Sequence, residues 1–408
     1  MAKVPPVEEG LNQQGSDATP GGASGPAARV GRAVAAGTLS VGLALTLAAC
    51  GAASSTGAAT KGTGASSAKA NVAAARAVIA DYLDHPSPFP ADAPLSKPLP
   101  AGTKIVYIAP KTPTSAAGAE AAAAAAKVLG ATIQVVSAGT TASEAQAAAA
   151  TVLAMKPAAA IVGGMPLSYF GDGLKKLAAA GIKVLSNATA EDTKPFGVTF
   201  NYRGAASFAL AGRLMADWVI VNKGASAKTV FYGIPAIDFS TAMQTGYEQE
   251  LHKNCTSCSV RSVQINVATL GTTAPQTVVS DLQSHPDTNV AVFVTDEIAA
   301  GLPAALSSSG ITGITTIGYA PSPQQLEYIK DGQMTAGLGL DVPTTNWTMM
   351  DAVARLILGD SPTDLENAGS APTKFLTKEN LASADVTKGW VAYPDYAERF
   401  AKVWHPAQ

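Results

Sequence analysis

The sequence predicts an α/β protein with two lobes, each built around a doubly wound parallel sheet. Continuous apolar runs alternate with segments of helical period, which is the pattern of parallel strands covered on both faces. This alternation occurs twice, with a break near residues 197–202. At 408 residues the chain is also too long for one small core and suits two.

The first set of alternating segments lies between residues 104 and 186. Gly130 and Gly181 stand where two of its helices should end, because glycine readily takes the left-handed conformation of a helix terminus. The expected strands are 104–109, 132–136, 158–162 and 183–186, and the expected helices are 115–129, 142–155 and 167–180.

The second set begins where residues 197–202 lead into a helix. Ligands of such sheets bind outside the carboxyl ends of the strands, so we expect a crevice there. The expected strands are 229–232, 260–266, 290–295, 315–318 and 335–338, and the expected helices are 204–222, 240–252, 274–284, 298–309, 324–331 and 344–358.

Two flanking regions complete the body. Residues 71–102 form a lead-in, with helical spacing over 71–84 and a proline-rich stretch, 86–100, that cannot be helical. The last region, 360–408, is rich in aromatic residues that we expect to hold the tail on a lobe. These are Trp390, Tyr393, Tyr396, Phe400 and Trp404.

Residues 1–50 are interpreted as a leader that ends in a lipoprotein signal peptide. Arg29 and Arg32 precede an apolar run, 33–49, that is shorter than the roughly 20 residues of a spanning helix. The run ends in Leu-Ala-Ala-Cys-Gly at 47–51, which resembles a bacterial lipobox. In lipoproteins of that kind a peptidase cuts before the cysteine, here Cys50, and its thiol carries lipid. The alternative is an uncleaved anchor with a coincidental cysteine.

Residues 51–70 contain mainly Gly, Ala, Ser and Thr, which predicts a flexible tether. With a lipidated Cys50 before it, the tether would hold an exported body at the outer face of the cell membrane.

Composition and missing motifs exclude several function classes. The formal net charge is −2, so no basic surplus points to nucleic acid. Residues 162–166 lack the Lys-Ser/Thr of a phosphate loop, and the histidines are scattered. Because no nucleophile–base pair can be assembled, we predict a protein that is not an enzyme and needs no cofactor.

The two remaining cysteines, Cys255 and Cys258, are expected to form a local disulfide, the default in an exported protein. With His252 they make a His-x-x-Cys-x-x-Cys pattern, which is the alternative of a zinc site. A fourth ligand is not evident, so we predict no metal centre.

Four segments, taken in order, resemble motifs of the type I periplasmic binding proteins, especially the sugar-binding branch. Phe-Asn-Tyr-Arg-Gly at 200–204 is similar to the family's Asp-Asn-x-x-Gly, and 293–301 to its strand that ends in Asn-Asp-x-x-Ala-x-Gly. Ile-Gly-Tyr at 317–319 stands where the family often has Gly-Phe-Asp, and 331–336 matches its Asp-Gly-x-x-x-Ala turn. The resemblance covers roughly residues 103–359, and the tail resembles actinobacterial lipoproteins.

The resemblance implies three hinge crossings between the lobes, which we place near 201–203, 319–321 and 339–342. The N-terminal lobe would then contain 103–202 and 321–339, and the C-terminal lobe 203–320 and 340–408. Short crossings absorb the backbone rotation when two lobes close on a ligand.

Asp296, Asp341 and Tyr319 are candidate ligand contacts in the second half of the chain. Asp296 ends a strand as the family's sugar-binding Asp does, or else it caps the next helix. Asp341 lies at the third crossing, where it either binds ligand or makes a hinge hydrogen bond. Tyr319 replaces the family's Asp or Asn and could stack on a ligand, which puts recognition of a simple hexose in doubt.

The other candidates follow strand ends in either lobe, and each has a structural alternative. Thr112 and Thr114 bind ligand or cap the next helix, Asn187 replaces the family's charged contact or stabilises a turn, and Asp238 caps a helix or faces the cleft. Phe239, Asn201 and Tyr202 are further candidates, and Met165, Tyr169 and Ala274 are weaker ones.

The resemblance implies a monomeric receptor that binds a small molecule, with sugar as the first choice, and passes it to the permease of an ABC importer. The alternative is a sensory receptor of the same fold that signals to a membrane partner. A lipid-anchored enzyme would need the catalytic pair that is missing. A DNA-binding regulator is disfavoured by the export signal.

Overall fold

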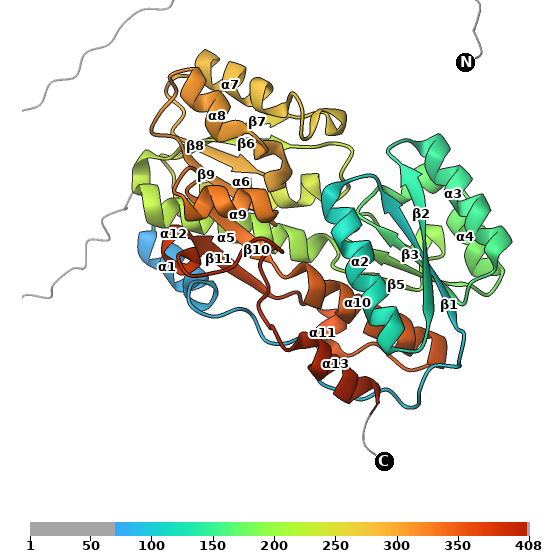
Figure 1. Cartoon of the computed structure of the whole chain (residues 1–408). Coiled ribbons are helices and arrows are strands. Elements are labelled where there is room, and N and C mark those ends of the chain that lie inside the picture. Colours follow the sequence, from blue (N-terminus) through green and yellow to red (C-terminus); the bar gives the residue numbers. More distant parts are fainter. Residues whose placement is uncertain (1–69, 406–408) are drawn as a thin grey trace, which may run out of the picture. The chain divides into compact units, whose positions relative to one another are not determined.

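The computed structural model describes residues 70–405. The leader, Cys50 and nearly all of the expected tether therefore lie outside the described residues. The described chain forms two α/β lobes, each with its own sheet (Figure 1).

The N-terminal lobe contains a five-stranded parallel sheet in the order β2-β1-β3-β4-β5. Its strands are β1 (Lys104–Pro110), β2 (Thr132–Gly139), β3 (Ala159–Gly163), β4 (Lys183–Asn187) and β5 (Phe200–Tyr202). Its helices are α2 (Pro113–Val128), α3 (Ala142–Met155), α4 (Gly173–Ala179), α10 (Val342–Leu358), α11 (Asp364–Asn367) and α13 (Tyr396–Trp404), with the 3₁₀ turns η2 (Leu167–Phe170) and η3 (Lys194–Phe196).

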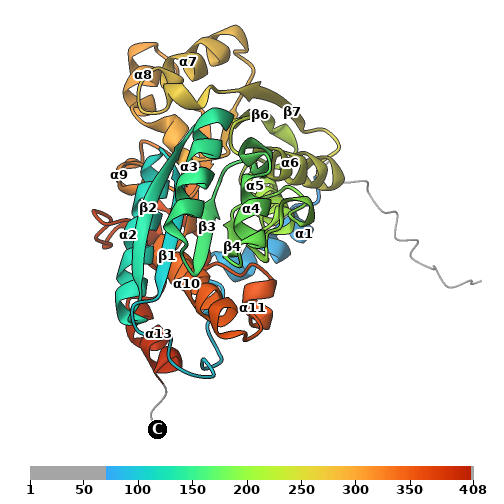
Figure 2. The same cartoon turned by 90° about the vertical axis from the view of Figure 1, so that its right-hand side faces the viewer.

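Side chains of this sheet alternate between two cores. Ile105 and Tyr107 on β1 pack with residues of α2, α10 and α13, whereas Val106 and Ile108 pack with α3 and α4. This follows from the two-residue period of a strand. Figure 2 shows α10 and α13, from the end of the chain, beside α2 from its beginning.

The C-terminal lobe contains a six-stranded sheet in the order β11-β10-β9-β8-β6-β7. Its strands are β6 (Lys228–Gly233), β7 (Ser259–Gln264), β8 (Val290–Phe293), β9 (Thr315–Tyr319), β10 (Ala336–Leu340) and β11 (Thr373–Thr377). Its helices are α1 (Val72–Ile79), α5 (Ala205–Lys223), α6 (Ser240–Asn254), α7 (Ala274–Ser284), α8 (Leu302–Ser308), α9 (Pro323–Lys330) and α12 (Lys378–Leu381). The 3₁₀ turns are η1 (Ala80–Tyr82), η4 (Gly224–Ser226), η5 (Val267–Thr269) and η6 (Asp296–Ala299).

The structure corrects the predicted division of the chain between the lobes. Residues 321–339 belong to the C-terminal lobe, because β10 pairs with β9 in its sheet. Much of 340–408 belongs to the N-terminal lobe instead, since α10 packs on α2 and the α13 residues Phe400 and Trp404 share a core with Trp347. Of that range, Leu340, β11, α12 and the following residues Ala384, Val386 and Trp390 stay with the C-terminal lobe, and β11 runs antiparallel to β10.

Two of the three predicted crossings occur. The chain leaves the N-terminal lobe between β5 and α5, near 201–203, and returns between β10 and α10, near 339–342. The crossing expected at 319–321 is wrong, because the chain continues from β9 through α9 to β10 in the same sheet. The lead-in, the link from α11 to β11 and the link from α12 to α13 also connect the lobes.

A buried charge cluster joins the lead-in to the C-terminal segments. The Arg355 Nε atom donates to Asp351 Oδ2 at 2.8 Å and lies 3.5 Å from Glu366 Oε2. Its terminal nitrogens donate to the carbonyls of Ala93 and Pro94. Asp351, Arg355 and Glu366 are all almost fully buried. One guanidinium therefore faces two carboxyl groups away from solvent.

This arrangement predicts how stability depends on pH. Burial, and then the neighbouring Asp351, raise the pKa of Glu366 from 4.5 to about 9. Between those two pH values the folded chain holds a proton that the unfolded chain releases, so this residue lowers stability as pH rises. Glu366→Gln should therefore reduce the loss of unfolding free energy between pH 5 and pH 9, as urea titrations would measure. An unchanged pH slope would contradict this.

Candidate functional site

A cavity of about 130 Å³ lies between the carboxyl ends of the strands of the two sheets. The residues that line it end or closely follow strands β1–β5 of the N-terminal lobe and β6–β10 of the C-terminal lobe. The first turn of α10 closes one side with Val342, Thr345 and Asn346. We call this cavity the cleft.

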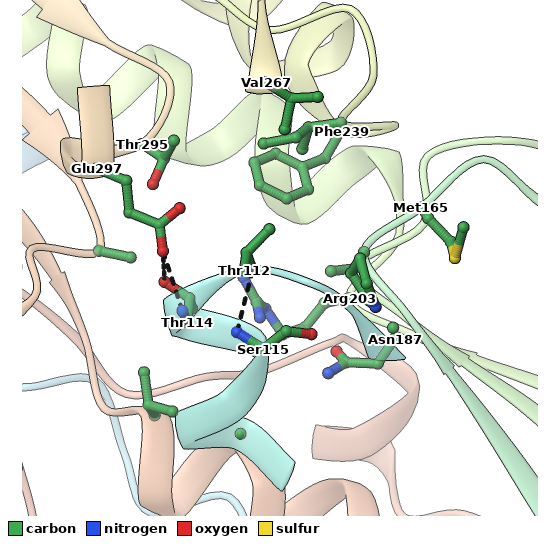
Figure 3. Close-up of a pocket in the computed structure, with 18 of the residues that line it drawn as sticks. Thr112, Thr114, Ser115, Met165, Asn187, Arg203, Phe239, Val267, Thr295 and Glu297 are labelled. Carbon is green, nitrogen blue, oxygen red and sulfur yellow. Dashed lines mark hydrogen bonds between the residues drawn. The ribbon is translucent and has the colours of Figure 1, made fainter. Parts of the chain in front are cut away.

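The wall from the N-terminal lobe is mainly polar. Thr112 and Ser115 come from the loop after β1 and the start of α2, and Asn187 ends β4 (Figure 3). The Thr112 hydroxyl accepts a hydrogen bond from the Ser115 backbone N–H at 3.2 Å, so it caps α2 at the cleft. Burial raises the pKa of Tyr107 to about 12, which keeps its hydroxyl protonated at neutral pH.

The wall from the C-terminal lobe is mainly apolar. Ile237 and Phe239 follow β6, and Val267 follows β7. The Phe239 ring stacks on Phe208 with centroids 4.2 Å apart, which fixes its orientation. Thr295, after β8, adds a polar group to this wall. A ligand that fits would offer polar groups to one lobe and an apolar face to the other.

Three polar atoms in the cleft lack a hydrogen-bond partner within the described protein. They are Asn187 Oδ1, Thr345 Oγ1 and Asn346 Oδ1, and each belongs to a side chain that is at most 6% exposed. Buried polar atoms in folded proteins almost always have a partner, and leaving one without costs about 1–3 kcal/mol. Their convergence on one cavity indicates a site for a polar molecule.

Arg203 enters the cleft from the crossing between β5 and α5. Its guanidinium donates to the Tyr319 hydroxyl and lies 4.9 Å from the centre of the Phe208 ring. The backbone of Arg203 has a positive φ of 59°. Two other residues that line the cleft, Ala188 (61°) and Ala320 (54°), also have a positive φ. Non-glycine residues rarely take this conformation, and strained backbone tends to occur at functional sites.

Hydrogen bonds join the lobes across the mouth of the cleft. Glu297 Oε1 accepts from the Thr114 backbone N–H at 3.0 Å and from its hydroxyl at 2.6 Å. Asp238 Oδ2 accepts from the backbone N–H groups of Ala190 and Glu191. Each contact joins residues of different lobes, so the structure represents a closed arrangement.

Comparison with known proteins assigns this architecture to a family. Residues 106–361, well over half of the chain, match the model of the periplasmic binding protein domain. The chain belongs to the periplasmic binding protein family. A search of curated proteins finds no significant match.

Solved structures of the family share the fold at low sequence identity. A glucose-galactose binding protein from Geobacillus stearothermophilus is 16% identical with a TM-score of 0.61, covering 69% of this chain and 99% of its own. A myo-inositol binding protein from Caulobacter is 22% identical with a TM-score of 0.61, covering 71% and 98%. A 5-methylthioribose transporter solute-binding protein from Thermotoga lettingae is 14% identical with a TM-score of 0.62, covering 76% and 99%.

In this periplasmic binding protein, five of the predicted site residues line the cleft. They are Thr112, Thr114, Asn187, Phe239 and Tyr319, and the weaker candidates Met165 and Tyr169 line it as well. Thr112 also makes the helix cap that was its structural alternative. All five lie at the carboxyl end of a strand or in the segment between it and the first turn of the next helix.

Asp296 does not line the cleft. Its side chain is fully buried against Gly318, and neither carboxyl oxygen has a hydrogen-bond partner within the described protein. Its alternative role as a helix cap is wrong, because η6 has no side-chain cap hydrogen bond. Burial raises the pKa of Asp296 well above its ordinary value. Its neighbours Thr295 and Glu297 line the cleft instead.

Asp341 also does not line the cleft, and it makes hydrogen bonds at the crossing, which was its alternative role. It caps α10 by accepting from the Thr344 N–H at 2.9 Å and hydroxyl at 2.7 Å, and it accepts from the Ala392 N–H at 2.9 Å. It therefore joins the crossing near 339–342 to the tail. Asp238 likewise joins the lobes through backbone hydrogen bonds and does not line the cleft.

Asn201, Tyr202 and Ala274 are structural as well. Asn201 accepts from the Ser186 hydroxyl at 2.9 Å and donates to the Thr189 carbonyl at 3.1 Å. Tyr202 is buried in the core and donates to the Ser370 carbonyl at 2.5 Å, and Ala274 is buried in the C-terminal lobe. The residues missed by sequence reasoning are Tyr107, Arg203, Glu297, Thr345 and Asn346.

The remaining sequence predictions concern cysteines, metals and the membrane. Cys255 and Cys258 form a disulfide in the structure, between α6 and β7. Within residues 70–405 no cluster of His, Cys, Asp and Glu could hold a metal ion. No helix in that range is long and apolar enough to cross a membrane.

Proposed function

We propose that this protein is an exported, lipid-anchored solute-binding protein that captures a small polar ligand, a sugar in the first instance, and delivers it to an ABC importer. The ligand would lie in the cleft and be enclosed by closure of the lobes. The observation that carries the proposal is the set of three buried, unpartnered polar atoms on Asn187, Thr345 and Asn346.

The size of the cleft supports a ligand of sugar size. Its volume of about 130 Å³ holds roughly ten water-sized spheres, since each occupies about 10–15 Å³ by this measure. A monosaccharide has about that number of non-hydrogen atoms. The amide and hydroxyl groups of the cleft suit sugar hydroxyls, and the Phe239 ring suits the C–H face of a sugar ring.

Related structures support the same ligand class. By their names, the relatives described above bind glucose and galactose, myo-inositol and 5-methylthioribose. Export and anchoring rest on the signal at residues 29–49 and on the lipobox cysteine Cys50. A lipid there would keep the receptor close to a membrane permease.

A thermal-shift screen of sugars, polyols and nucleosides tests the proposal. A ligand that binds the closed form stabilises the folded state by mass action and raises the melting temperature. Failure of every compound to shift the melting temperature, at concentrations up to several millimolar, would contradict binding of this ligand class.

Thr345→Val separates ligand binding from stability. The substitution removes a buried hydroxyl that has no partner among residues 70–405, so the unliganded melting temperature should stay equal or rise. The shift caused by a ligand found in the screen should fall, with roughly a tenfold loss of affinity. Thr348→Val is the matched control, because the Thr348 hydroxyl donates to the Thr344 carbonyl on the same helix and does not line the cleft. An unchanged affinity in Thr345→Val would remove this hydroxyl from the site.

A further inference from the structure

Arg203 is a buried cation at the edge of the cleft. Its side chain is only 6% exposed, and it lies in the short crossing between the two lobes. Glycine would adopt its positive φ more readily, since the backbone of other residues is strained there. A long charged side chain at such a position indicates that the side chain itself is used.

The surroundings of Arg203 contain aromatic rings but no acidic partner. Within residues 70–405 it takes part in no ion pair, whereas the buried Arg355 is paired. Its neighbours are the Tyr319 hydroxyl and the Phe208 ring. The guanidinium is also close enough to Tyr107 and Tyr202 to offset part of the burial-induced rise of their pKa values.

A buried guanidinium without a carboxylate is energetically costly. Arginine keeps its charge at any ordinary pH, and buried charges in proteins are normally paired. The other charged side chain of the cleft is Glu297, whose Oε1 is engaged by Thr114. In the view of Figure 3, Glu297 and Arg203 lie on different sides of the cavity, and Asn187 also lines it. Arg203 also borders a second cavity, but the three unpartnered polar atoms lie in the cleft, so an anion for Arg203 can come from the cleft ligand.

We propose that the ligand carries a carboxylate that pairs with Arg203, so that the protein binds a sugar acid in preference to the neutral sugar. This inference rests on the proposed function and specifies its ligand class. A planar guanidinium binds a carboxylate through two parallel hydrogen bonds, which a neutral hydroxymethyl group cannot offer. Asn187, Thr345 and Asn346 remain for the hydroxyl groups.

Calorimetric titration with matched pairs of compounds tests the inference. The pairs are glucose and glucuronate, and galactose and galacturonate, in each of which a carboxylate replaces the hydroxymethyl group. In at least one pair the acid should bind at least about tenfold more tightly than the neutral sugar. Arg203→Gln should abolish this preference. Arg213→Gln is the control, because Arg213 lies on α5 and does not line the cleft.

The outcomes separate the inference from the proposed function. If neutral sugars bind as tightly as their acids in every pair, or Arg203→Gln retains the preference, the carboxylate assignment is wrong while a sugar receptor remains. If no sugar or sugar acid of the pairs binds, and no compound of the thermal-shift screen binds, both the proposed function and the carboxylate assignment fail. The comparison of acid with neutral sugar needs only the wild-type protein, so it decides the matter even if Arg203→Gln does not fold.

Discussion

Trp404→Ala should lower the free energy of unfolding by about 3–5 kcal/mol, the range for removing a large aromatic side chain from a core. The Trp404 ring is fully buried and stacks on Trp347 with centroids 5.2 Å apart and planes inclined by 9°. Its indole N–H donates to Asp351 Oδ1 at 2.6 Å. The substitution removes the packing and leaves a buried carboxylate oxygen without this donor. Urea denaturation measures the effect.

Trp404→Phe separates the two contributions. It retains an aromatic ring against Trp347 but loses the hydrogen bond to Asp351, so its loss should be smaller than that of Trp404→Ala. Lys402→Ala, at an exposed position of the same helix, should change stability by less than about 0.5 kcal/mol. A loss below about 1 kcal/mol in Trp404→Ala would show that α13 does not hold the tail on the N-terminal lobe.

Gly246→Val should prevent folding or lower the free energy of unfolding by at least about 3 kcal/mol, at or beyond the upper end of ordinary overpacking. Helices α5 and α6 cross at Gly212 and Gly246. A Cβ atom at Gly246 would lie 2.2 Å from the Ala209 carbonyl oxygen, and one at Gly212 would lie 2.0 Å from that of Met243. Backbone atoms cannot move aside as a side chain can, so the helices would have to separate.

Thr245→Val is the matched control for that crossing. It places the same valine side chain at the adjacent, exposed position of α6, so it tests a valine on this helix without the clash. Its effect should stay within about 0.5 kcal/mol. Equal losses in both variants, measured by urea denaturation, would contradict the close approach of the two helices.

Local patterns were sufficient to predict the two lobes and their strands. The apolar run that becomes β1 and the run that becomes β8 are buried strands wherever they are placed, so their neighbours in space did not have to be known. The lobe to which β10 belongs could not be predicted in this way. Its sequence, Ala-Gly-Leu-Gly-Leu, fits either sheet, and pairing with β9 depends on long-range contacts. The same holds for α13, whose apolar face could cover either lobe.

The candidate site was predictable to the same degree. Residues at the carboxyl end of a strand, such as Asn187 and Tyr319, reach the cleft because parallel strands end at one edge of a sheet. Which of three consecutive residues lines the cleft after β8 depends on the geometry of the 3₁₀ turn. There Thr295 and Glu297 line the cavity, whereas Asp296 is buried against Gly318. Asn346 reaches it only because α10 returns to the N-terminal lobe.

A crystal structure of the protein with the tightest compound from the binding experiments tests the central claim most directly. The account predicts the ligand between the lobes, within hydrogen-bond distance of the side chains of Asn187, Thr345 and Asn346. A ligand bound elsewhere, with these three side chains making no contact to it, would contradict the account.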